Sequence, residues 1–266
     1  MAGFDDRDYL RNEQYHDSSN LNARIQLHVR FGTNPYGWQR WVFDQFDLGP
    51  QVRILELGCG SAWLWAENLD RIPAGWKVTL TDFSPGMVQQ ARSTVQEKAE
   101  HFSFAVVDAQ ALAFADACID AVIANHMLYH VPDRQRAFSE IRRVLRPGGR
   151  FYAATNGRAH LQELSELASR FGYDTPLARE LSFNLEHGAA ELEPWFASVT
   201  LRRYEDGLAI TETAPLIDYL LSLSAKGTLS NDRLEQLKSY VERELAQHGA
   251  VRVTKDTGLF IATKAD

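Results

Sequence analysis

Short apolar runs alternate with amphipathic stretches along the chain from position 52 onward. The apolar runs are almost uninterrupted, which is typical of parallel strands that helices cover on both faces of a sheet. The stretches between them have helical periodicity at about 62–70, 85–100 and 133–145. Strands are predicted at 52–57, 77–81, 102–107, 119–124 and 150–155. The alternation predicts an α/β fold assembled from βαβ units.

The pattern becomes less regular after the fifth predicted strand. The elements predicted there are, in chain order, a helix at 157–171, a strand at 198–204, helices at 214–223 and 231–247, and strands at 251–254 and 259–263. A loop-rich stretch separates the first of these helices from the strand that follows it. This region is expected to be an insertion and not another plain crossover of the sheet.

The first 50 residues begin with a polar segment and end in an amphipathic helix. Positions with the spacing i, i+3, i+4, i+7 and i+8 define one face of that helix: Trp38, Trp41, Val42, Gln45 and Phe46. This spacing indicates packing against the core. No ligand is needed to explain the aromatic residues of this face.

The composition excludes several classes of protein. The chain has 266 residues, 28 Lys and Arg against 35 Asp and Glu, a formal net charge of −7 and a pI near 5.6. Because nucleic-acid affinity depends on clustered basic side chains, nucleic acid is not expected among its partners. The N-terminal residues lack the pattern of a secretory signal, and acidic residues interrupt the longest apolar stretch. These features predict a cytoplasmic protein without a membrane span.

A glycine turn is the most informative local feature. Gly58 and Gly60 follow the first predicted strand and precede a helix, and the next strand ends in Asp82. Glycines permit a sharp turn and a close approach of the backbone to a ligand. A carboxylate at the tip of the neighbouring strand can accept hydrogen bonds from ribose hydroxyls, although Asp82 could instead cap the next helix. The arrangement favours a ligand that contains an adenosyl group.

Two classes of ligand fit this arrangement, a dinucleotide and S-adenosylmethionine. The dinucleotide fingerprint requires a third glycine at position 63, where this chain has the bulky Trp63. The pattern Glu56-x-Gly58-x-Gly60 instead resembles the first motif of class I S-adenosylmethionine-dependent methyltransferases. Ala62 stands where that family often has another glycine, and alanine is small enough to preserve the resemblance.

The segments that follow resemble the later motifs of the same family, in the same order and spacing. They are Thr81-Asp82-Phe83-Ser84-Pro85-Gly86-Met87, then Val107-Asp108-Ala109, the segment from Ile119 through Asn125 and His126 to Asp133, and Leu145-Arg146-Pro147-Gly148-Gly149-Arg150-Phe151. The subgroup they resemble includes ubiquinone and menaquinone biosynthesis methyltransferases and many small-molecule methyltransferases. The resemblance implies these contacts with S-adenosyl-L-methionine as cofactor: Glu56, Gly58, Gly60, Asp82, Phe83, Met87, Asp108, Ala109 and Asn125.

Candidate contacts with the methyl acceptor follow the fourth strand. His126 is a possible general base, since an ordinary histidine titrates near neutrality, but packing against the cofactor explains it equally well. Tyr129 and His130 are further candidates for the substrate side, with His130 more simply explained by packing. Two histidines four residues apart lack an evident third ligand, so no metal site is expected. The resemblance also places Tyr15 and His16 in a lid over the donor.

The resemblance implies a Rossmann-like, doubly wound, mostly parallel seven-stranded sheet with an antiparallel last strand and a helical cap. Residues 1–50 would form a helical lid and 51–266 the methyltransferase domain, with 157–249 contributing the cap. The implied activity is methyl transfer to a small-molecule acceptor by in-line displacement. Three alternatives remain at this point: a tRNA or protein methyltransferase, a nicotinamide-dependent oxidoreductase, and a non-catalytic S-adenosylmethionine-binding protein.

Overall fold

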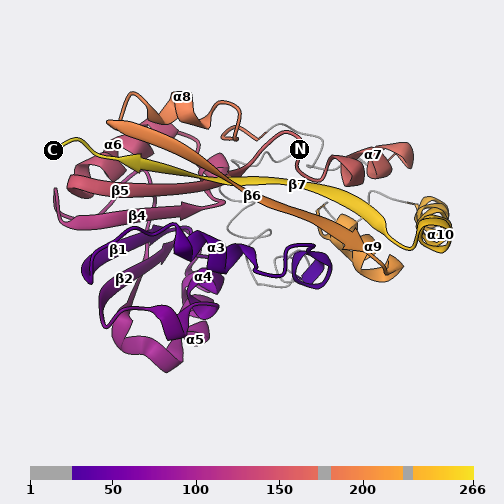
Figure 1. Ribbon diagram of the computed structural model, residues 1–266, viewed down its shortest axis with the longest axis horizontal. Helices are drawn as coiled ribbons and strands as arrows, with labels where there is room; N and C mark the ends of the chain where they lie inside the picture. Colours follow the sequence, from indigo (N-terminus) through magenta and orange to yellow (C-terminus); the bar gives the residue numbers. More distant parts are fainter. Residues whose placement is uncertain (1–25, 173–180, 224–229) are drawn as a thin grey trace.

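The computed structural model describes residues 26–172, 181–223 and 230–266. These residues form one seven-stranded sheet with the strand order β3-β2-β1-β4-β5-β7-β6 (Figure 1). The strands are β1 (Gln51–Leu57), β2 (Gly75–Asp82), β3 (Phe102–Val106), β4 (Ile119–Asn125), β5 (Leu145–Asn156), β6 (Ser198–Ile210) and β7 (Val251–Thr263). Strands β1 to β5 pair in parallel, and β7 is antiparallel to both β5 and β6. The predicted fold class is confirmed.

Helices cover both faces of this sheet. They are α3 (Trp38–Asp44), α4 (Trp63–Ala66), α5 (Pro85–Thr94), α6 (Arg134–Val144), α7 (Gln162–Arg170), α8 (Gly188–Leu192), α9 (Thr213–Ser222) and α10 (Asn231–His248), with short 3-10 turns at Leu69–Arg71, Gln96–His101 and Leu128–His130. Helices α3, α4 and α5 lie on one face, and α6 and α8 lie on the other. Because each face has its own buried cluster, the strands between them are apolar on both sides, as the sequence pattern indicated.

The two last strands extend well beyond the rest of the sheet. Strand β5 ends at Asn156, which pairs with Thr257, whereas 251–256 of β7 pair only with 205–210 of β6. At about 3.3 Å per residue, this antiparallel strand pair projects roughly 20 Å past the carboxyl ends of the parallel strands. Helices α7, α9 and α10 surround the projecting part and form a third buried cluster with it (Figure 1). The strand pair thus carries a helical unit at the edge where open α/β sheets bind ligands.

Several predicted boundaries were wrong in their details. The runs predicted at 251–254 and 259–263 form one continuous strand, because β6 satisfies the backbone of the polar residues between them. The strand predicted at 198–204 extends to Ile210 for the same reason, and it lies within the central sheet. The helix expected at 85–100 ends at Thr94, and a 3-10 segment with non-helical backbone at Lys98 follows.

A helix that crosses a membrane needs about 20 predominantly apolar residues. No helix in the described parts of the chain has the necessary combination of length and hydropathy.

Candidate active site

The glycine turn after β1 has a backbone that only small residues accommodate. Gly58 has φ +67° and Gly60 has φ +54°. A Cβ added at Gly58 would lie 2.7 Å from the Cβ of Met127, which follows β4. The backbone N–H of Cys59 donates to the carbonyl of Thr81 at 2.8 Å, so the turn is held against the end of β2. Its shape is therefore fixed by both neighbouring strands.

Asp82 joins the glycine turn to the start of helix α5. One carboxylate oxygen accepts from the Gly60 N–H at 3.0 Å, and the other accepts from the Ser84 N–H at 2.8 Å. Burial raises the pKa of Asp82, and these backbone N–H groups oppose that effect. The N-cap of α5 is Ser84, whose hydroxyl accepts from the Met87 N–H. The capping interpretation of Asp82 is thus wrong, and its carboxylate is positioned by two hydrogen bonds.

Glu56 lies beneath the same turn. Its side chain is 2% exposed, and one carboxylate oxygen accepts from the indole N–H of Trp65 at 2.6 Å. Burial raises the pKa of Glu56 to about 7, with the hydrogen bond from Trp65 acting against that rise and the charge of Asp82 adding to it. The two acids are therefore close enough to influence each other. A cationic ligand nearby would favour the ionised form of both.

The residues expected around an adenine come from the adjoining loops. Met87 and Ala109 are buried, and Phe83 is half-buried. The N–H of Val107 donates to the carbonyl of Asp82 at 3.0 Å and so joins the end of β3 to the end of β2. The carboxylate of Asp108 accepts from both the backbone and the side-chain amide of Gln110, each at 3.0 Å. The structure therefore brings the predicted second and third motifs to one edge of the sheet.

Asn125 ends strand β4 beside the glycine turn, and His126 follows it. The Oδ1 atom of Asn125 is buried without a hydrogen-bond partner. His126 has φ +57°, and its backbone N–H donates to the carbonyl of Ala154 at 3.1 Å. Its ring packs against Trp38 with 5.3 Å between centroids. Burial and, to a smaller degree, the charge of Lys255 lower the pKa of His126 to about 4, so this imidazole is neutral at pH 7.

Two other predicted contacts lie one turn further along. Tyr129 and His130 belong to the 3-10 turn Leu128–His130, and their rings meet edge to face at 4.5 Å. The carbonyl of Tyr129 accepts from the hydroxyl of Ser182. Tyr15 and His16 lie outside the described residues. Within the described ranges, no group of three or more His, Cys, Asp or Glu residues could hold a metal ion.

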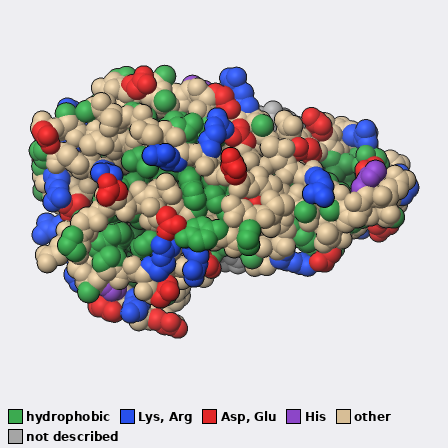
Figure 2. All heavy atoms as spheres, viewed as in Figure 1, with side chains coloured by type: hydrophobic (Ala, Val, Ile, Leu, Met, Phe, Trp, Pro, Cys, Tyr) green, Lys and Arg blue, Asp and Glu red, His purple; other side chains and the backbone are tan. Residues whose placement is uncertain are grey.

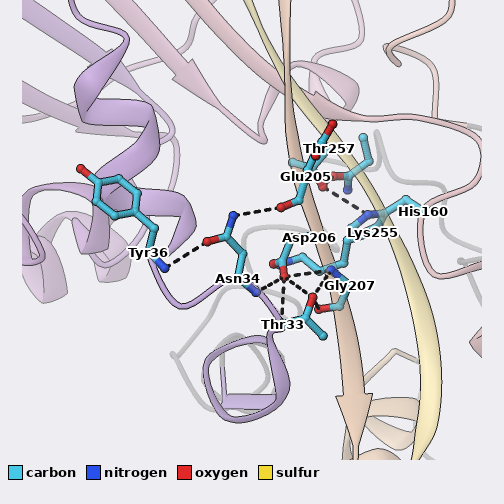
Figure 3. A network of polar contacts seen from close by, with 10 residues as sticks. Thr33, Asn34, Tyr36, His160, Glu205, Asp206, Gly207, Lys255 and Thr257 are labelled. Carbon is cyan, nitrogen blue, oxygen red and sulfur yellow. Dashed lines mark hydrogen bonds and ion pairs between the residues drawn. The ribbon is translucent and has the colours of Figure 1, made fainter.

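The structure adds residues to this edge that the motifs did not indicate. His28 and His160 stack with 6.2 Å between ring centroids. The hydroxyl of Thr257 lies 3.3 Å from Nδ1 of His160 (Figure 3). Lys255, on the projecting part of β7, pairs with Asp206 on β6, and both side chains are almost fully buried. The one sequence feature that could have marked Lys255 as a site residue is its place among polar residues within an otherwise apolar terminal strand.

Comparison with known proteins supports this arrangement. Residues 55–153 match the family model described as a methyltransferase domain. The chain is 32% identical over 143 residues to a ubiquinone/menaquinone biosynthesis C-methyltransferase of Acidiphilium cryptum, covering 51% of this chain and 55% of that protein. It is 29% identical over 205 residues to a malonyl-[acyl-carrier protein] O-methyltransferase of Erwinia pyrifoliae, covering 74% of each.

Solved structures show the same fold. The phosphoethanolamine N-methyltransferase 2 of Haemonchus contortus, in complex with S-adenosyl-L-methionine, aligns with a TM-score of 0.61 at 21% identity and covers all of this chain and 61% of its own. The YcgJ protein from a Bacillus species aligns with a TM-score of 0.57 at 19% identity, covering 86% of this chain and 98% of its own.

Residues 55–153 therefore match a methyltransferase domain, and the predicted resemblance to class I methyltransferases is confirmed. The match to the Acidiphilium relative spans little more than half of that protein's length.

Proposed function

We propose that the chain transfers the methyl group of S-adenosyl-L-methionine to a small-molecule acceptor. The observation that carries this proposal is the fixed carboxylate of Asp82, which hydrogen bonds orient beside the glycine turn at the carboxyl edge of the sheet. Oxygens held in this way retain lone pairs that can accept from ribose hydroxyls. The methyltransferase names of the relatives agree with the proposal.

The residues present fit this donor. Gly58 and Gly60 let the backbone approach it, Asp82 would orient its ribose, and buried apolar side chains would flank its adenine. Glu56, Asp108 and Asn125 complete the proposed set together with Phe83, Met87 and Ala109. When bound, the donor supplies a methyl group on a positively charged sulfur. The protein then has to align the acceptor with that methyl group and exclude water. Little covalent chemistry by the protein is needed.

His126 contacts the acceptor in this proposal, through hydrogen bonding. Its pKa of about 4 makes the imidazole neutral at pH 7 but a weak base. A weak base holds a proton poorly at neutral pH, so we infer an orienting role. The contact with Trp38 fixes the plane of the ring. Tyr129 and His130 are placed on the acceptor side of the same proposal.

The proposal also includes the division of the chain that the motifs suggested. Residues 1–50 serve as a lid, 51–266 as the methyltransferase domain, and the helices within 157–249 as the cap. The contact of the 26–34 segment with the projecting strand pair supports the lid, because Gly32 forms a β-bridge with Leu208. We also propose a cytoplasmic location, which cell fractionation tests.

An acceptor that is small, and not a polyanion, fits the surface charge. The formal net charge is −7. On the face shown in Figure 2, basic side chains are interspersed with acidic ones over the whole surface. A broad nucleic-acid interface depends instead on basic side chains gathered in one patch or stripe.

Calorimetric titration with S-adenosylhomocysteine tests the donor. We expect binding to the wild type and a loss of at least tenfold in affinity for Asp82→Ala, because the ribose hydroxyls lose their acceptor. Asp47→Ala is the matched control, since this exposed carboxylate pairs with Arg150 away from the glycine turn. Binding of NADH without binding of S-adenosylhomocysteine would contradict the proposal. A screen with methyl-labelled donor against a metabolite extract then identifies the acceptor.

A further inference from the structure

Four ring-bearing side chains from separate parts of the chain meet beyond the end of β4, and we call them the histidine cluster: His28, Trp38, His126 and His160. Trp38 contacts His126, and His28 stacks on His160. The charge of Lys255 lowers the pKa of all three histidines. His126 also lowers the pKa of His28 and of His160, so the two ring pairs are neighbours.

Polar atoms in and beside this cluster lack protein partners. Nδ1 of His28, Nε1 of Trp38 and Oδ1 of Asn125 are all buried without a hydrogen bond. Buried polar atoms are satisfied in the great majority of cases, because an unpaired one pays the full cost of desolvation. The atoms on His28 and Trp38 lie within the cluster and point to a polar ligand that completes their hydrogen bonds, whereas Asn125 belongs to the proposed donor-binding set.

A buried ion pair lies beside the cluster. Asp206 directs one carboxylate oxygen at the backbone N–H groups of Thr33, Asn34 and Gly207, at 2.8–3.0 Å, and its other oxygen accepts from the ammonium group of Lys255 (Figure 3). The backbone amides thus compensate part of the carboxylate charge. The charge of Lys255 lowers the pKa of all three histidines, and on His28 it exceeds the opposing effect of Asp206. Nζ of Lys255 lies 5.9 Å from the centroid of the Tyr204 ring, which packs edge to face on Trp38 at 5.5 Å, so a positive charge lies beside the cluster.

We propose that the histidine cluster binds the methyl acceptor and selects acceptors whose reacting group is an oxyanion, a carboxylate or a phenolate. This inference rests on the proposed function. The positive field of Lys255 and the unpartnered indole N–H of Trp38 favour a negatively charged oxygen, and the same field disfavours an ammonium group. The neutral imidazoles of His28, His126 and His160 add N–H donors without adding charge.

The transfer step balances without a base. An electron pair of the acceptor oxygen forms the new oxygen–carbon bond, while the sulfur–carbon bond of the donor breaks and leaves its electron pair on sulfur. A singly charged acceptor and a positively charged sulfur become a neutral ester or ether and a neutral sulfide. No proton moves, which agrees with the absence of a strong base at His126.

The test removes the positive field while it preserves packing. In the double variant Lys255→Met/Asp206→Asn, neither buried charge is left without its partner, and the amide oxygen of the new side chain can still accept from the N–H groups of Thr33 and Asn34. Acetate, malonate, benzoate and 4-nitrophenol are offered with methyl-labelled donor, beside ethanolamine and benzylamine. We expect label on the acids or the phenol at rates at least tenfold above the amines. For the accepted compound, we expect the double variant to raise KM at least tenfold.

Binding of S-adenosylhomocysteine distinguishes a site for the acceptor's oxyanion from a site for the carboxylate of the donor itself. If the cluster binds the acceptor, the Kd of S-adenosylhomocysteine stays within about twofold in the double variant, which also shows that the variant is folded. An equal loss of S-adenosylhomocysteine affinity would assign the positive site to the donor's own carboxylate and overturn the proposal. The matched control is Arg203→Met/Asp256→Asn, which removes a more exposed ion pair between the same two strands. It should change neither KM nor Kd.

Two other results would overturn the proposal: faster methylation of amines than of acids and phenols, or an unchanged KM in the double variant. A protein that labels no compound of any class contradicts the proposed function itself. In that case, NMR spectra of the histidine side chains in the S-adenosylhomocysteine complex test oxyanion binding at the cluster independently of any activity. We expect benzoate to shift the resonances of His28, His126 and His160, and benzamide to leave them in place. An equal response to both compounds, or to neither, would count against the oxyanion site.

Discussion

Replacing Gly58 with alanine combines two separate costs at the glycine turn. The φ of +67° places an alanine in the left-handed region, which costs about 1–2 kcal/mol. The new Cβ would also lie 2.7 Å from the Cβ of Met127, an atom that side-chain rotation cannot move away. Overpacking of this kind costs about 1–3 kcal/mol more. The free energy of unfolding should therefore fall by about 2–5 kcal/mol in Gly58→Ala.

A second glycine isolates the steric part of this cost. Gly249, at the end of α10, has φ +75°, and a Cβ added there would meet nothing within 4 Å. Gly249→Ala should lose only the conformational part, about 1–2 kcal/mol. Urea unfolding of both variants, with S-adenosylhomocysteine titration in parallel, makes the comparison. Equal losses of stability in the two variants would refute the clash with Met127, and unchanged ligand affinity in Gly58→Ala would refute a close approach of the donor to this turn.

Three further results are expected. A pKa of Glu56 raised from 4.5 to about 7 means that its contribution to the free energy of unfolding falls as pH rises through this range, by up to about 3 kcal/mol. Urea unfolding of Glu56→Gln should therefore show a smaller decline between pH 5 and 8 than the wild type, whereas parallel curves would show that Glu56 is not the source. For His126→Asn, kcat should drop while the pH profile above pH 5.5 keeps its shape; loss of an acidic limb near pH 6.5 in the variant would instead identify His126 as a base. Asp206→Ala leaves Lys255 buried without its partner and should lower the free energy of unfolding by about 3–5 kcal/mol, whereas Arg203→Ala, whose partner can be solvated, should cost about 1 kcal/mol or less; similar losses would contradict the difference in burial.

Local periodicity predicted the parallel part of the fold well. Strands β1 and β4 begin and end within one residue of the predicted boundaries, because helices bury both of their faces and leave an apolar signature. Continuity of β7 through Lys255 and Asp256 could not be predicted, since it depends on pairing with β6, which lies about fifty residues earlier in the chain. Long-range pairing overrides the local polarity of such a segment.

The site residues likewise include some that local spacing predicts and others that only long-range contacts bring in. Glu56 and Asp82 lie at the ends of strands and Gly60 lies in the turn after β1, so their spacing sufficed to bring them together at one edge. The helical spacing of Trp38 indicated core packing and gave no sign of its contact with His126. His28 and His160 join the site only because the projecting strand pair and the 26–34 segment fold against each other. No local pattern in the sequence encodes that contact.

The structure of the protein in complex with S-adenosylhomocysteine tests the central claim most directly. The account predicts that both ribose hydroxyls lie within hydrogen-bond distance of the Asp82 carboxylate, with the adenine between Phe83 and Ala109 and the sulfur directed toward His126. A ligand bound elsewhere, or a ribose that makes no contact with Asp82, would contradict the assignment of this edge as the methyl-donor site.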